Sequence, residues 1–198
     1  MPQERPPSDE KTARRDGKPG DGSRRGRAER RHRADKPSVS VHRHQARILA
    51  LQVIYEVDVT DHGLDEVIAR TLHDPEETTP PEVQTYAERL ARGVAEHGEQ
   101  IDVYIADAAP AFPVPQLASV DRNVLRLAIY ELLHQRDVPI KAAINEAVEL
   151  AKRYGGLNSS RFVNGVLGTV LTSVEREQAF ASDPPPAPGD ESTPPTDS

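Results

Sequence analysis

The chain has 198 residues, of which only 36% are hydrophobic, and it contains neither cysteine nor tryptophan. Globular domains contain about 45–50% apolar residues, so this composition predicts that part of the chain does not fold into a core. The absence of cysteine excludes disulfides, iron–sulfur clusters, thiol catalysis and thiolate zinc sites. Residues 1–47 hold 14 of the 25 basic and 7 of the 32 acidic residues, so a basic N-terminal segment precedes an acidic remainder.

Both ends of the chain have the composition of disordered segments. Residues 1–38 are rich in Arg, Lys, Gly and Pro and have almost no aliphatic side chains, so apolar burial cannot offset the entropy of ordering them. Residues 179–198 are acidic and rich in proline, which disfavours helix and sheet alike. We therefore expect one folded domain over 39–178, between a disordered basic arm and a disordered acidic tail. Because we find neither a signal sequence nor a long apolar stretch, we expect a cytoplasmic protein that does not contact membranes.

Hydrophobic spacing predicts an all-α domain of about seven helices. Apolar residues recur every three or four positions in each segment, and no segment alternates in the manner of a half-buried strand. The predicted helices cover about 40–58, 64–73, 80–96, 101–108, 117–132, 139–154 and 159–174. The helix over 117–132 is apolar around most of its circumference, so we expect it at the centre of the core. Thr79 and Glu82 predict a capping box at the start of the third helix.

The sequence contains no recognisable catalytic or metal-binding motif, such as a phosphate-binding glycine loop, an HExxH pair or a nucleophile elbow. Two carboxylate pairs are candidates for acid–base chemistry: Glu146 with Glu149, and Asp121 with Glu131. We interpret them as solvated or paired with cations such as Arg122 and Lys152. Three histidines near the basic arm lie among arginines, whose charge would repel a metal ion. We therefore expect no enzyme activity, no metal and no cofactor.

The basic charge continues from the arm into the first predicted helix. Arg43 and Arg47 lie four positions apart, hence on the same side of this helix, where they would form a rigid basic surface. Neutralisation of phosphates by Arg and Lys gives proteins their sequence-independent affinity for nucleic acids. The pattern therefore favours a nucleic-acid surface. The alternative is a solvated face that only keeps the protein soluble.

The loop before the last predicted helix has the residue types of a site for single-stranded RNA. Residues 155–162 combine a glycine turn with short polar side chains, Arg161 and Phe162. Amides and hydroxyls at a helix start can bind a phosphate, arginine adds charge, and an aromatic ring can stack on a base. Phe162 also fits the apolar stripe of the last helix, so burial in the core is the alternative.

Four segments of the chain resemble the bacterial NusB family of transcription antitermination factors, in the same order and at the same spacing. They read RILALQVIY at 47–55, DRNVLRLAIYEL at 121–132, INEAVELAK at 144–152 and FVNGVL at 162–167. The resemblance spans about 41–172 and implies an all-helical fold of two packed subdomains. It also implies that the protein pairs with the ribosomal protein NusE and binds the boxA element of nascent RNA. The complex would then help RNA polymerase to read through terminators in ribosomal RNA operons.

The resemblance also implies which residues carry this function. The residues expected to face RNA are Arg43, His44 and Arg47 in the first helix and Asn158, Arg161 and Phe162 before and within the last. We expect NusE to contact Tyr55 and the exposed faces of the helices predicted over 101–108 and 117–132, because an aromatic anchor beside an acidic rim suits a basic partner.

In two respects the sequence leaves room for other interpretations. Histidines and a glutamine interrupt the arginine run that opens the first helix in many relatives, so we expect the arm over 11–33 to compensate. The alternative function is a storage homodimer that hides its own RNA surface. NusB-like domains also precede the catalytic domain of a ribosomal RNA methyltransferase, but only the proline-rich tail follows Val174 here, so we expect no such enzyme.

Overall fold

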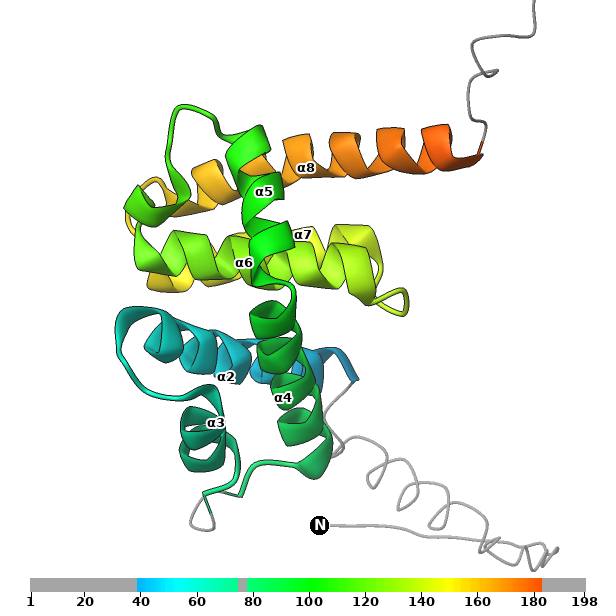
Figure 1. The fold of residues 1–198 in the computed structure, drawn as a ribbon. Helices are drawn as coiled ribbons and strands as arrows, with labels where there is room; N and C mark the ends of the chain where they lie inside the picture. Colours follow the sequence, from blue (N-terminus) through cyan, green and yellow to red (C-terminus); the bar gives the residue numbers. More distant parts are fainter. Residues whose placement is uncertain (1–38, 75–77, 183–198) are drawn as a thin grey trace, which may run out of the picture. The chain divides into compact units, whose positions relative to one another are not determined.

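The computed structural model describes residues 39–74 and 78–182, and these residues form seven α-helices, one short 3₁₀ helix and no strand (Figure 1). The elements are α2 (Val39–Val59), α3 (Leu64–Leu72), α4 (Pro81–Glu96), α5 (Gly98–Ala108), η1 (Val114–Gln116), α6 (Ser119–His134), α7 (Ile140–Tyr154) and α8 (Ser159–Ser182). The all-α prediction is therefore confirmed, although α8 extends beyond the expected end of the domain at 178. The predicted disorder of 1–38 falls outside the described residues, as does most of the predicted tail.

The helices form two packed groups. In the first group α2 lies against both α3 and α4, and in the second α6, α7 and α8 lie against one another. Helix α5 follows α4 after the single residue His97 and packs on α6 and α8 (Figure 1). Helix α6 contacts α2 and α4 of the first group as well as its own neighbours. Through α6, the two groups share one hydrophobic core.

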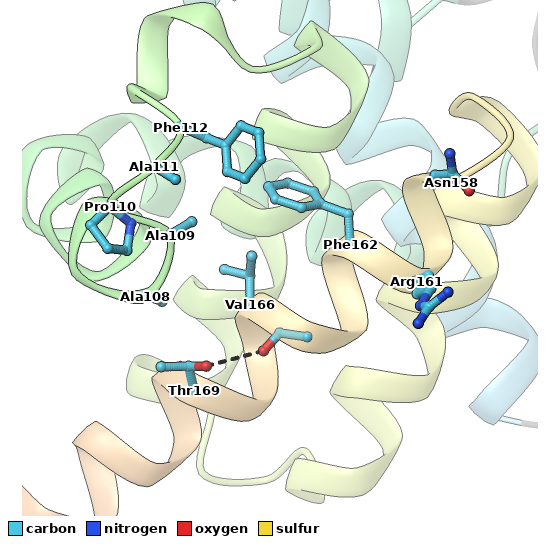
Figure 2. A pocket seen from close by; sticks show the side chains of 11 residues that line it. Ala108, Ala109, Pro110, Ala111, Phe112, Asn158, Arg161, Phe162, Val166 and Thr169 are labelled. Carbon is cyan, nitrogen blue, oxygen red and sulfur yellow. Dashed lines mark hydrogen bonds between the residues drawn. The ribbon is translucent and has the colours of Figure 1, made fainter.

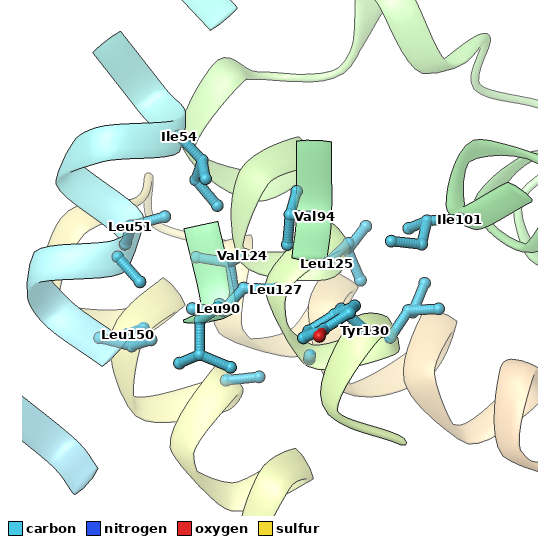
Figure 3. Packing of buried hydrophobic residues seen from close by; sticks show 14 of the residues in the cluster. Leu51, Ile54, Leu90, Val94, Ile101, Val124, Leu125, Leu127, Tyr130 and Leu150 are labelled. Atoms are coloured by element: carbon cyan, nitrogen blue, oxygen red, sulfur yellow. The ribbon is translucent and has the colours of Figure 1, made fainter. Parts of the chain in front are cut away.

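Helix α6 lies at the centre of this core, as the sequence predicts. Between Asp121 and Glu131 every residue except Arg126 is buried. Side chains from four other helices surround it (Figure 3). They include Leu51 and Ile54 of α2, Leu90 and Val94 of α4, Ile101 of α5 and Leu150 of α7. Burial of a leucine or isoleucine contributes about 1.5–3 kcal/mol, so this cluster supplies much of the free energy of folding.

The start of α4 differs from the predicted capping box. Pro80, not Thr79, is the N-cap residue, and no side chain caps the helix. The backbone oxygen of Pro80 accepts hydrogen bonds from the amides of Val83 and Gln84 at 2.9 and 3.1 Å. The carboxylate of Glu82 turns instead toward α2. The two prolines have no N–H to satisfy and fix φ, so the helix can begin without a side-chain cap.

Helices α4 and α6 approach closely at Gly93. An alanine Cβ at this position would lie 2.0 Å from Cζ of Tyr130, whose ring is buried and whose hydroxyl accepts a hydrogen bond from Gln135 at 3.2 Å. Alanine favours a helix by about 1 kcal/mol over glycine, but overpacking a core costs about 1–3 kcal/mol. We therefore expect Gly93→Ala to lower the free energy of unfolding by about 1–2 kcal/mol in urea denaturation.

The matched control for this prediction is Gly98→Ala at the start of α5, where a Cβ would meet nothing within 4 Å. This control should be neutral or stabilising. Equal or greater stability of Gly93→Ala would show that Tyr130 can move aside without cost, and would contradict the prediction.

Candidate nucleic-acid interface

The first turns of α2 carry an arginine and two histidines that face carboxylates from other parts of the chain. We call His42, Arg43 and His44 the α2 edge. Their partners are Glu82 of α4 at 3.2 Å, Asp137 between α6 and α7 at 2.5 Å, and Glu146 of α7 at 2.7 Å, respectively. The hydrogen bond from Arg43 holds the pKa of the Asp137 carboxyl below its usual value. The α2 edge is therefore half-buried and locally neutralised, and an RNA phosphate would have to replace these carboxylates.

Arg47 does not belong to this surface, which corrects the expectation that it forms an exposed pair with Arg43. Its side chain is only 4% exposed, and Nε and Nη2 donate hydrogen bonds of 2.8–3.1 Å to the carboxylate of Glu131 on α6. The hydroxyl of Tyr86 on α4 donates to the same carboxylate at 2.6 Å. Four residues advance a helix by slightly more than one turn, which here rotates Arg47 toward the buried stripe of Ala46 and Ala50.

The surroundings of this buried cluster keep Arg47 charged and Tyr86 protonated. Desolvation lowers the pKa of Arg47, but the hydrogen bonds and charge of Glu131 outweigh it, so the net pKa shift is upward. Burial, followed by the charge of Glu131, raises the pKa of Tyr86, so its hydroxyl stays protonated as a donor. The cluster joins α2, α4 and α6. Arg47 thus holds α2 in place rather than reaching solvent.

Two of the acidic residues interpreted as solvated or paired with near neighbours are placed differently by the structure. Glu131 is the buried partner of Arg47. Asp121 is also buried, and Oδ1 of its carboxylate has no hydrogen-bond partner in the described part of the chain. Arg122 pairs with Asp58 of α2 at 2.6 Å rather than with Asp121. The cause in each case is the central position of α6, which leaves almost none of its residues on the surface.

The loop before α8 places the second set of candidate residues at one groove. Ser159 closes the turn by accepting a hydrogen bond from the amide of Gly156 at 2.8 Å, and the backbone oxygen of Asn158 accepts the amide of Phe162 at 3.0 Å. Asn158 and Arg161 are exposed, whereas Phe162 is half-buried against the core. All three line an open groove of about 680 Å³ between α8 and the segment after α5 (Figure 2).

The groove has a second aromatic wall, which the sequence did not reveal. Phe112 is 55% exposed, and its ring meets that of Phe162 edge to face, with centroids 5.8 Å apart. Figure 2 shows the two rings next to each other, one from the segment after α5 and one from α8. Phe162 therefore serves both the core and the groove. Phe112 lies between prolines in a loop without periodicity, so no pattern in the sequence marked it.

Tyr55 lies in a different groove, lined almost entirely by apolar side chains. We call it the Tyr55 groove. Its lining residues are Ile48, Leu51, Gln52 and Tyr55 of α2, Val120 of α6 and Tyr154 of α7, around a volume of about 240 Å³. Tyr55 and Tyr154 are each 39% exposed. Helix α6 is buried on nearly all sides and contributes only Val120 to this groove, so little of the α6 face expected to contact NusE is exposed.

The described residues contain neither a cluster of metal-binding side chains nor a helix suited to a membrane. Within 39–74 and 78–182, no group of three or more metal-binding side chains could hold an ion. None of the helices described in the structure has the length and apolarity needed to cross a membrane.

Comparisons with known proteins agree on one family. A protein-family model, described as the NusB family, matches residues 44–172 of this chain. The Transcription antitermination protein NusB of Roseiflexus castenholzii is 51% identical over 132 residues, which cover 66% of this chain and 92% of that protein. The protein of the same name from Chloroflexus aggregans is 52% identical over 139 residues, with coverage of 68% and 91%.

Two solved structures are similar in fold. NusB of T. maritima has a TM-score of 0.63 at 35% identity, over 70% of this chain and 96% of that chain. A crystal structure of antitermination factors NusB and NusE in complex with double-stranded RNA has a TM-score of 0.61 at 26% identity, over 67% of this chain and 97% of the matched chain. The expectation drawn from the sequence motifs is thereby confirmed at the level of the family and the fold.

Proposed function

The chain belongs to the NusB family of transcription antitermination factors, which bind RNA and are not enzymes, and on that premise we propose that it binds boxA RNA together with NusE. The complex would promote read-through by RNA polymerase in ribosomal RNA operons. The observation that supports this most directly is the likeness to a solved complex of NusB, NusE and RNA. On this chain, two surfaces have suitable chemistry: the α2 edge and the groove lined by Phe112 and Phe162.

At the α2 edge, binding would be an exchange of anions. Arg43 donates to Asp137 and His44 contacts Glu146, and both side chains are half-buried. A phosphate offers the same hydrogen-bonding geometry as a carboxylate and carries neighbouring charges along the RNA chain. RNA would therefore displace these acidic side chains, while the buried Arg47 keeps α2 in position.

At the groove, recognition would combine charge with stacking. Arg161 is exposed beside Phe162, and Asn158 lies at the N-terminal end of α8, where the helix dipole favours an anion. Phe112 and Phe162 provide ring surfaces for an unpaired base. The groove is open to solvent, so a nucleotide can enter it without rearrangement of the core.

Anisotropy of labelled boxA RNA at two salt concentrations, with and without NusE, tests this proposal. We expect NusE to tighten binding and Arg43→Ala to weaken it about three- to tenfold, with a salt slope lower by about 0.7, the value for one contact to single-stranded RNA. Asp137→Asn is the matched control, because it removes the competing carboxylate while leaving Arg43 in place, and it should bind at least as well as the wild type. No binding of boxA RNA in the presence of NusE would contradict the proposal.

A further inference from the structure

A third groove, of about 480 Å³, lies between the first turns of α2 and the first half of α4. His42 and Arg43 line it from α2, and Thr85, Tyr86 and Arg89 line it from α4. It therefore shares two residues with the α2 edge and extends that surface onto a different helix.

Two guanidinium groups meet at one aromatic ring in this groove. Cζ of Arg89 lies 4.9 Å from the centroid of the Tyr86 ring, and Cζ of Arg43 lies 5.2 Å from the same centroid. The ring cannot move freely, because it is only 8% exposed and its hydroxyl is bound to Glu131. A fixed ring thus holds two positive charges near each other.

The carboxylates near this groove contact His42 and Arg43 rather than Arg89. Glu82 faces His42, and Asp137 pairs with Arg43, while the charge of Arg89 acts on Asp137 only as a minor influence that lowers its pKa. Among the described residues, Arg89 forms no ion pair. By contrast, Arg92, three residues later on α4, pairs with Asp65 at 2.8 Å and Glu88 at 2.9 Å.

We propose that this groove is a further phosphate-binding surface for single-stranded RNA, with Arg43 and Arg89 as its cations. The proposal rests on the proposed function, since it extends the path of the RNA from the α2 edge onto α4. The charge of Arg89, which no carboxylate of the described residues pairs with, favours a polyanion as the occupant. The basic segment that precedes Val39 in the sequence carries the same sign of charge and would not neutralise Arg89.

The test uses the full chain with NusE and three labelled RNAs: boxA alone, boxA lengthened by several nucleotides at the 5′ end, and boxA lengthened at the 3′ end. We expect Arg89→Ala to weaken binding of one lengthened RNA roughly three- to tenfold and to lower its salt slope by about 0.7. Arg92→Ala is the matched control on the same helix, and it should bind like the wild type. Thermal melting should show both variants folded, because both side chains are on the surface.

The outcomes separate this inference from the function on which it rests. If the wild type binds no RNA, the proposed function fails. If the wild type binds and Arg43→Ala weakens it, but Arg89→Ala matches the wild type in affinity and salt slope on every RNA, only the present proposal is overturned.

A photocrosslink identifies the occupant directly. With p-benzoylphenylalanine in place of the exposed Thr85, irradiation of the complex should attach the chain to RNA. Crosslinks that form only to the chain's own basic arm, or only to NusE, would show a different occupant and would contradict the proposal.

Discussion

Arg47→Ala should lower the free energy of unfolding by about 3–5 kcal/mol, the range for removal of one partner of a buried ion pair. The variant leaves the carboxylate of Glu131, which is 2% exposed, without its counter-charge. Tyr86 remains as a single donor to that carboxylate, at 2.6 Å, and cannot replace a guanidinium that donates through two nitrogen atoms. Urea denaturation followed by circular dichroism measures the loss.

Two control variants show whether burial causes this effect. Arg43→Ala breaks an ion pair whose Asp137 side chain is 55% exposed, so it should change the free energy of unfolding by only about 0–1 kcal/mol. The double variant Arg47→Met with Glu131→Gln removes both buried charges and keeps an acceptor for Tyr86, so it should recover most of the lost stability. A loss below 1 kcal/mol for Arg47→Ala would contradict the structural role of the pair.

The same double variant separates the two roles considered for Arg47. If Arg47 only positions α2, the folded double variant should bind boxA RNA with NusE as the wild type does. If Arg47 contacts RNA, the double variant should bind more weakly although it is folded. The burial of the side chain favours the first result.

The helices were predictable because each is encoded locally. Apolar spacing predicted 40–58 and 80–96, and the structure has α2 at Val39–Val59 and α4 at Pro81–Glu96. Prolines and glycines mark the ends of helices in the sequence itself. Helix α6 was recognisable as the central helix because its apolar residues cover most of its circumference, which only a helix with neighbours on several sides can bury.

The position of Arg47 was not predictable in the same way. A spacing of four residues places two side chains on one side of a helix, but it does not say whether that side faces solvent. The deciding partner, Glu131, lies 84 residues away in the sequence. Arginine is rarely buried without such a partner, so the local sequence favoured exposure. Only the packing of α2 against α6 brings the two charges together.

The same holds for the candidate surfaces: residues close in sequence could be predicted together, whereas residues brought together by the fold could not. Asn158, Arg161 and Phe162 were found together because one loop and the following turn carry all three. Phe112 and Arg89 were missed, since the residue that gives each its meaning lies on another element. Phe112 meets Phe162 of α8, and Arg89 shares the Tyr86 ring of its own helix with Arg43 of α2. Grooves formed between elements have no signature in a single stretch of sequence.

Tyr55→Ala should weaken the binding of NusE by about 2 kcal/mol or more, which is roughly thirtyfold, as for an aromatic hot spot at the centre of an interface. Tyr55 stands in the apolar Tyr55 groove, 39% exposed, so a partner can cover its ring and remove that surface from water. Because the side chain is partly exposed, its removal should change the melting temperature little. Isothermal titration calorimetry with purified NusE measures the affinity.

Val59→Ala is the matched control, because Val59 is an exposed apolar residue, 45% exposed, on the same helix but outside the Tyr55 groove. It should bind NusE as the wild type does.

Light scattering of the same proteins tests the alternative of a storage homodimer. If the wild type is dimeric and Tyr55→Ala makes it monomeric without changing its affinity for NusE, the groove joins two copies of this chain, and NusE must bind elsewhere. If Tyr55→Ala loses NusE and leaves the oligomeric state unchanged, the aromatic side chain is an anchor for NusE.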